Sequence, residues 1–181
     1  MRVVILTSSF PLGPSDGSPA GLFARSFSIA LARLGNEVIV VTQERPGVPE
    51  KEDEIEVVRF PWSGKGKPLV ELKLRRPGDL LKAISFLRNA LRTVRRIEKV
   101  DHCFALWAAP SGLVASLWSR LSGVPYSVWC LGSDVWVYGR SRFTRPWIRT
   151  VLSRSTRVFA DGEGLRREAE SIGRKPAWFL S

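Results

Sequence analysis

Polar side chains and glycines stand where buried strands are expected to end, and these residues are the best candidates for chemistry. Ser133 and Asp134 follow the apolar stretch 126–130, and their oxygens could hydrogen-bond the hydroxyl groups of a ligand. The alternative for this pair is an Asx-type helix cap. Gly17 and Gly21 precede an expected helix, whose N-terminus favours a phosphate or a developing negative charge. Their alternative is a simple tight turn.

Two further candidates stand at strand ends. Trp107 could form an apolar wall beneath a ring-shaped ligand, or it could simply pack beside the apolar stretch 110–121. Gly132 lies in the loop with Ser133 and Asp134 and leaves room for close approach of a ligand. His102 and Cys103 are neighbours on one expected strand, so they point to opposite faces and cannot act as a pair.

Several familiar motifs are absent from the sequence. There is neither a GxxxxGK[ST] phosphate loop nor a convincing GxGxxG fingerprint. With two cysteines, no CxxC pair and one histidine, we expect no structural zinc site and no metal. We also expect no tightly bound cofactor, and the catalytic residues stay unknown at this point.

The elements that position these candidates alternate between strand and helix. Strands are predicted at 2–7, 37–42, 55–60, 102–107, 126–130 and 157–161, with one more beginning at 176–181; helices are predicted at 23–34, 79–98, 110–121, 145–154 and 163–172. The helix over 79–98 is expected to bury one apolar stripe, made of Leu80, Ile84, Leu87, Leu91, Val94 and Ile97.

This alternation predicts one Rossmann-like α/β domain over residues 1–181, with a parallel sheet of six or seven strands and helices on both faces. Ligands of such folds bind beyond the carboxyl ends of the strands. The loops 8–22, 108–112 and 131–139 qualify. Residues 61–78 are expected to form an insert.

The charge balance favours an anionic partner. The 181 residues carry 28 Lys and Arg against 17 Asp and Glu, which gives a net charge of +11, and 21 of the 28 are arginines. Two basic surfaces are candidates for contact with an anionic membrane, the first with Arg88, Arg92, Arg95 and Arg96 and the second with Arg142, Arg145 and Arg149. Phe143 and Trp147 could enter the headgroup region beside the second set. The alternative is an ordinary solvated face, and without a recognition motif we expect no nucleic-acid binding.

No segment resembles a membrane span or a signal peptide, because the apolar runs are short and interrupted. The sequence therefore predicts a cytoplasmic protein, with peripheral contact at the inner face of the membrane as a further option.

Four segments, in the right order, carry a family resemblance. They are FPLGPSDGSPAGLFARSFSIALARLGNEVIVVT, LWAAPSGLVASLWSRLSGVP, GSDVW and RVFADGEGLRREAESIG. Together they resemble the N-terminal domain of the retaining GT-B glycosyltransferases of family 4. The resemblance implies transfer of a sugar from a nucleotide sugar, as co-substrate, to a lipid-linked or glycan acceptor. It also implies a C-terminal nucleotide-sugar-binding domain, or a partner subunit, that residues 1–181 do not contain.

Two departures from the family pattern keep an alternative open. The family often has HAHW where this chain has Phe104-Ala105-Leu106-Trp107, and HGSD where it has Leu131-Gly132-Ser133-Asp134. Leucine can neither donate a hydrogen bond nor polarise a bond. The alternative is a non-catalytic binding module, or a split subunit that docks a catalytic partner. In either case, we expect the isolated chain to be inactive, because half of the cleft is missing.

Overall fold

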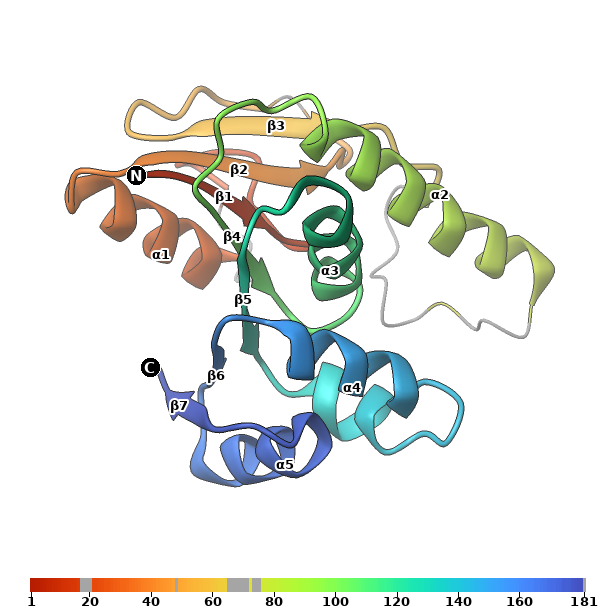
Figure 1. Ribbon diagram of the computed structural model, residues 1–181. Helices are drawn as coiled ribbons and strands as arrows, with labels where there is room; N and C mark the ends of the chain where they lie inside the picture. The colour runs from red at the N-terminus through yellow and green to blue at the C-terminus, as the bar shows by residue number, and fades with distance from the viewer. Residues whose placement is uncertain (17–20, 48, 65–71, 73–75, 181) are drawn as a thin grey trace. The chain divides into compact units, whose positions relative to one another are not determined.

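The computed structural model describes residues 1–16, 21–47, 49–64, 72 and 76–180. The chain divides into two compact units, residues 1–100 (unit 1) and 101–181 (unit 2). Each unit has its own parallel strands and helices (Figure 1). That the whole chain acts as a single domain stays a prediction.

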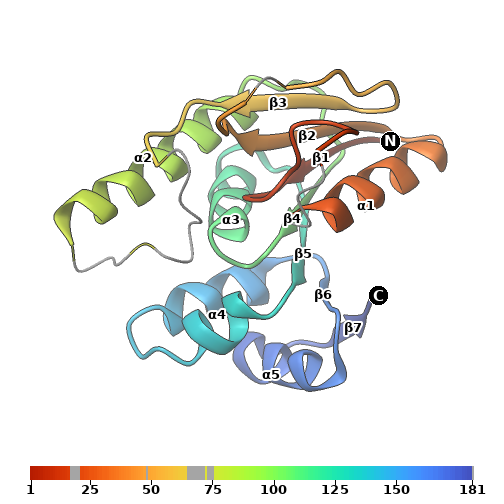
Figure 2. The ribbon, with the colours of Figure 1, turned by 180° about the vertical axis from the view of Figure 1, so that it is seen from behind.

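Unit 1 is built on three parallel strands in the order β3-β2-β1. Its elements are β1 (Arg2–Leu6), α1 (Leu22–Arg33), β2 (Glu37–Gln43), β3 (Glu56–Phe60) and α2 (Pro77–Val94). Strands β1 and β2 are apolar runs rich in β-branched residues, and the residues from Val3 to Leu6 and from Val38 to Val41 are buried, as expected when both faces are covered. Figures 1 and 2, which look from opposite sides, show α1 and α2 on opposite faces of these strands.

Two arginines from later in the chain hold the loop that follows β1. Arg45, just beyond β2, donates from Nη1 to the carbonyl oxygen of Phe10 at 3.1 Å. Arg59, on β3, donates from Nη2 to the carbonyl oxygen of Pro11. Burial, helped by the nearby charge of Arg45, lowers the pKa of Arg59. The loop is therefore held by side chains that lie far along the sequence.

Unit 2 is built on four parallel strands in the order β4-β5-β6-β7. Its elements are β4 (His102–Leu106), α3 (Ser111–Ser122), β5 (Tyr126–Cys130), the π-helix η2 (Asp134–Gly139), α4 (Arg145–Arg154), β6 (Val158–Ala160), α5 (Glu163–Gly173) and β7 (Ala177–Phe179). Helix α4 packs against α3, η2 and α5. Since the strand pairings within both units are parallel and a helix lies between most consecutive strands, the predicted Rossmann-like α/β fold class is confirmed.

Two details of the prediction are wrong. Val94, a member of the expected core stripe, is buried as predicted, but the rest of the buried face of α2 is formed by Phe86 and Ala90. Leu80 and Ile84, also expected in the stripe, are 44% and 49% exposed. Phe86 instead packs edge-on against Phe60, with ring centroids 5.0 Å apart. Residues 134–139, expected to be loop, form η2. Most of the expected insert 61–78 lies outside the described residues.

Candidate functional site

The Asp134 side chain joins the turns that follow β4 and β5 by hydrogen bonds. Its side chain is fully buried, and its Oδ2 accepts a hydrogen bond from the backbone N–H of Ala108 at 2.7 Å. Its Oδ1 faces the backbone N–H groups of Gly132 and Val135, both at 3.1 Å, and that of Leu131 at 3.3 Å. Both carboxylate oxygens are thus used within the chain. The structure gives Asp134 the role of shaping the site, and direct contact with a ligand stays a prediction.

The environment of Asp134 opposes its charge. Burial raises the pKa of this carboxyl to about 6, while the hydrogen bonds from backbone N–H groups oppose the rise. A charge this deeply buried is tolerated because several N–H dipoles point at it. The turns are therefore sensitive to the protonation state of a single carboxyl group.

Gly132 and Ser133 form the turn that Asp134 supports. Gly132 has φ +116°, a conformation that disfavours other residues, and its carbonyl oxygen accepts hydrogen bonds from the N–H groups of Val135 and Trp136. Ser133 is half-buried and makes no side-chain hydrogen bond that caps η2. Its hydroxyl is therefore not used in the way that the helix-cap alternative requires, and ligand binding by this residue stays a prediction.

Trp107 directly follows β4 with the left-handed backbone value φ +70°. Its backbone N–H donates a hydrogen bond to the carbonyl oxygen of Trp129 at 2.9 Å, and its carbonyl oxygen accepts one from the backbone N–H of Gly112 at 3.0 Å. Such a conformation costs a tryptophan about 1–3 kcal/mol, and strain of this kind is often found at functional sites. The side chain is half-buried, at the same strand ends as Gly132 and Asp134.

Gly21 begins α1 in unit 1, with φ +91°. A Cβ atom at this position would lie 2.8 Å from the carbonyl oxygen of Ser9 and 2.9 Å from Cα of Phe10. The helix therefore starts in close contact with the loop after β1, and only glycine fits there. No side chain caps α1, and its first turn has no acidic residue. The N-terminus of α1 therefore keeps the positive end of the helix dipole, as expected of a terminus that binds an anion. Gly17 lies outside the described residues.

Sequence reasoning missed two groups of this site in unit 2. The first is the backbone N–H of Ala108, which leaves no sequence signal because every residue except proline supplies one. The second is Ser111, the first residue of α3, whose hydroxyl is buried without a hydrogen-bond partner among the described residues. Its place in the Pro-Ser-Gly segment that carries the family resemblance could have pointed to it.

His102 lies away from these turns, and the two cysteines are buried in the core. His102 begins β4, at the opposite end of the strand from Trp107, and its Nε2 lies 3.0 Å from the hydroxyl of Ser127. Burial lowers the pKa of this imidazole and raises the pKa of both thiols, Cys103 and Cys130. Among the residues that the structure describes, no group of three His, Cys, Asp or Glu side chains could hold a metal ion.

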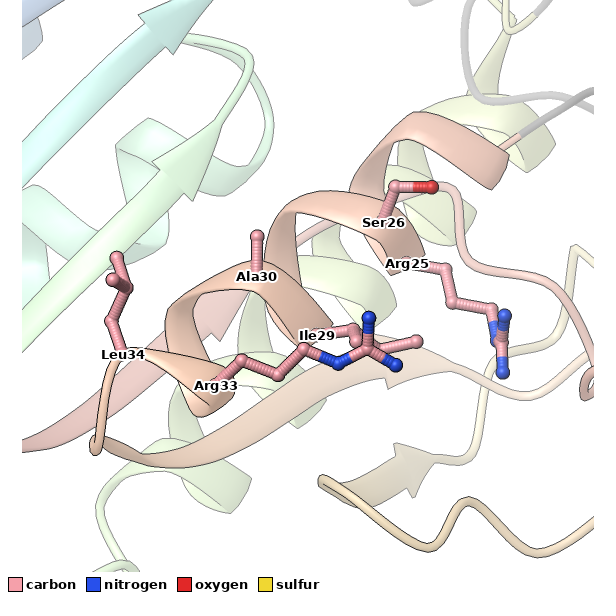
Figure 3. Close-up of a pocket in the computed structure, with 6 residues that line it drawn as sticks. All are labelled: Arg25, Ser26, Ile29, Ala30, Arg33 and Leu34. Carbon is pink, nitrogen blue, oxygen red and sulfur yellow. The ribbon is translucent and has the colours of Figure 1, made fainter.

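A shallow cavity of about 570 Å³ lies along α1 in unit 1, lined by Arg25, Ser26, Ile29, Ala30, Arg33 and Leu34 (Figure 3). Both arginines are already paired, Arg25 with Glu52 and Arg33 with Glu54, each with a closest N–O distance of 2.7 Å. Since its cations are neutralised, the cavity has no special attraction for an anionic ligand. It is therefore not the candidate site.

The basic residues predicted to meet a membrane are exposed. They are Arg88, Arg92, Arg95 and Arg96 on or just after α2, and Arg142, Arg145 and Arg149 before and on α4. In the described part of the chain, no helix is long and apolar enough to cross a membrane.

Comparisons with solved structures found several proteins that share this fold. Sucrose-phosphate synthase of Thermosynechococcus elongatus aligns with a TM-score of 0.63 at 13% identity, over 99% of this chain and 87% of that one. HepE of Anabaena, in complex with UDP, aligns with a TM-score of 0.55 at 14% identity, over 96% of this chain and 41% of that one. UGT89C1 of Arabidopsis thaliana, complexed with UDP, aligns with a TM-score of 0.59 at 11% identity, over 99% of this chain and 48% of that one.

The chain spans less than half the length of the HepE and UGT89C1 chains. A comparison with curated proteins gave no match. At these identities the structural likeness shows the fold, which is that of the N-terminal domain of a GT-B glycosyltransferase.

The sequence itself gives the family. The family described as glycosyl transferase 4-like domain matches residues 20–178, which is most of the chain. The chain therefore belongs to the glycosyl transferase 4-like domain family, and the predicted relationship with family 4 glycosyltransferases is confirmed.

Proposed function

We propose that this chain is the acceptor-side half of a glycosyltransferase, which transfers a sugar from a nucleotide sugar to a lipid-linked or glycan acceptor. The observation that carries the proposal is the joining of the turns after β4 and β5 by the buried carboxylate of Asp134. This arrangement holds Trp107 and Ser133 at the carboxyl ends of adjacent strands, where ligands of α/β folds bind.

The chemistry of the turns suits a sugar. An aromatic ring can cover the apolar face of a sugar ring, and a hydroxyl can bind its polar edge. Trp107 and Ser133 are both half-buried, so each keeps part of its side chain accessible. In this proposal Asp134 is a positioning residue, because both its oxygens are occupied by backbone N–H groups.

The proposal requires a partner half that binds the nucleotide sugar. Two of the similar structures contain UDP, and this chain spans less than half of each. We propose that the nucleotide sugar is a co-substrate held by a C-terminal domain or subunit. In keeping with this, residues 1–181 alone are expected to show no transfer and little affinity for UDP-, GDP- or ADP-sugars, which calorimetry and product analysis would test.

Transfer assays on the protein that unites this chain with its nucleotide-sugar-binding half test the proposal. Radiolabelled nucleotide sugars are offered with polyprenyl-phosphate-linked saccharides and with free oligosaccharides. Trp107→Ala and Ser133→Ala are each expected to reduce kcat/KM by about 10- to 100-fold, the effect of losing one to two good contacts in the transition state. The matched control is Ser153→Ala, which removes the hydroxyl of an exposed serine on α4.

The alternative of a non-catalytic module has its own support. Leu106 is fully buried in β4, and neither it nor Leu131 offers the polar group that the family often has at these positions. No transfer with any donor, but acceptor binding that Trp107→Ala weakens, would favour the module. Full transfer activity in both site variants would overturn the role of these turns.

A further inference from the structure

The segment from η2 to α4 exposes aromatic and basic side chains together. We define the aromatic–arginine surface as Trp136, Val137, Arg140, Arg142, Phe143, Arg145, Trp147 and Arg149. Phe143 is 73% exposed and Trp147 is 58% exposed, which is unusual for such large apolar groups. Val137 is 55% exposed and adds an aliphatic group.

The surface has one sign of charge. Residues 140–157 contain six arginines and neither aspartate nor glutamate. Within the described part of the chain, no carboxylate forms an ion pair with Arg140, Arg142, Arg145 or Arg149. Four unpaired guanidinium groups attract an anionic partner more strongly than arginines that already have carboxylates beside them.

Two of the arginines lie directly over aromatic rings. The guanidinium carbon of Arg140 is 4.5 Å from the ring centre of Trp136, and that of Arg142 is 5.6 Å from the ring centre of Phe143. Cation–π contact keeps charge and apolar surface side by side. Each of these two pairs can therefore offer an aromatic ring to an apolar phase and a guanidinium to the phosphate at its boundary.

One side of α4 packs into the core of unit 2. Ile148, Val151 and Leu152 of α4 are buried, and α4 packs against α3, η2 and α5. Residues 140–144, which include Phe143, join η2 to α4. The exposed aromatic residues are thus not part of the core of unit 2.

We propose that the aromatic–arginine surface binds the headgroup region of a bilayer that contains anionic phospholipid. Tryptophan and phenylalanine enter the membrane interface, and arginines bind lipid phosphates at the same depth. A bilayer accounts for both parts of the surface, because Val137 can enter the acyl boundary but cannot stack on a nucleic-acid base. The proposal does not depend on the proposed function, since a domain without transferase activity would still bind.

Vesicle sedimentation with the complete chain tests this surface. We expect the protein to pellet with vesicles of phosphatidylglycerol and phosphatidylcholine, to stay in solution with phosphatidylcholine alone, and to bind less as salt is raised. Each arginine near an anionic surface strengthens binding by about fivefold, so changing Arg142, Arg145 and Arg149 to Gln should weaken it about a hundredfold.

The matched control changes Arg33, Arg167 and Arg174 to Gln, which removes the same charge from exposed arginines elsewhere. It should retain binding within a few-fold of wild type. A second variant, with Phe143→Ser and Trp147→Ser, keeps the charge and should weaken vesicle binding more than tenfold. Circular dichroism checks that each variant is folded.

Three outcomes would overturn the proposal. The first is equal weakening by the test and control sets, which would make net charge alone responsible. The second is equal pelleting on neutral and anionic vesicles, or none on either. The third is tight binding of single-stranded RNA without vesicle binding, which would assign the surface to nucleic acid.

Discussion

The carboxylate of Asp134 and the backbone N–H of Ala108 lie 2.7 Å apart, and this one hydrogen bond joins the end of β4 to the end of β5. The two residues are 26 positions apart in the sequence. Because the carboxylate also faces three N–H groups of its own turn, its loss would leave several buried donors without an acceptor.

Replacing Asp134 should therefore destabilise the protein strongly. Asp134→Ala is expected to lower the free energy of unfolding by about 2–5 kcal/mol, because each buried donor left unsatisfied costs about 1–3 kcal/mol. Urea unfolding followed by circular dichroism measures this. Asp161→Asn, at an exposed position in the same unit, is the control and should change stability little. Equal stability of the two variants would contradict the role given to Asp134.

The raised pKa of Asp134 predicts a pH dependence with a definite sign. The folded protein binds this proton below about pH 6, whereas the ordinary value for the unfolded chain is 3.8. Between these values the folded state holds more protons, so this carboxyl adds stability as the pH falls from about 7 towards 4. Asp134→Asn removes the titration. The stability of wild type relative to this variant should therefore increase on acidification, and parallel pH profiles for the two proteins would rule the effect out.

Alanine substitutions at two glycines with similar backbones distinguish the cost of a close contact from the cost of a left-handed conformation. Gly21 has φ +91° and would place a Cβ against the backbone of Ser9 and Phe10, whereas Gly35 has φ +83° and nothing within 4 Å. Gly35→Ala should cost about 1–2 kcal/mol, the strain of a left-handed residue alone. Gly21→Ala should cost clearly more, because backbone atoms must move. Thermal unfolding of both variants measures the difference, and equal losses would mean that the contact at Gly21 relaxes freely.

Helix α2 offers a test of which face is buried. Phe86→Ala should lower the free energy of unfolding by about 3–5 kcal/mol, because Phe86 is buried against the rings of Phe60 and Trp62. Ile84→Ala should cost far less, since Ile84 is 49% exposed. Urea unfolding of the two variants decides the matter. A larger loss for Ile84→Ala would restore the apolar stripe that periodicity predicted.

Periodicity located the elements well and failed where two patterns compete. The strand at 126–130 and the helix at 145–154 have the predicted bounds, because a short, buried, mainly apolar run and a helix with proline in its first turn are strong local signals. On α2 the apolar residues cover more than one face, so the sequence cannot say whether Ile84 or Phe86 turns inward. The choice depends on Phe60 and Trp62, which come from β3 and the residues just beyond it.

The candidate site, too, could be predicted from the sequence only in part. Gly132, Ser133 and Asp134 could be placed at a strand end because they follow the apolar run of β5 directly. The role of Asp134 in joining two turns depends on Ala108, which contributes its backbone N–H. The side chain at position 108 gives no sign of this bond in the sequence. The left-handed backbone of Trp107 was equally hidden, because tryptophan has no preference for that conformation.

The anchoring of the first loop by Arg45 and Arg59 fixes an order of events during synthesis. Strands β1 and β2 and the helix between them can assemble as soon as Gln43 has left the ribosome, since their contacts are local. The loop after β1 receives its second anchor only when Arg59 emerges, 48 residues after Pro11. A nascent chain paused just before Arg59 would hold paired strands and a loop that has its bond from Arg45 but lacks the one from Arg59. That loop should then be the segment of unit 1 most open to proteolysis until β3 is made.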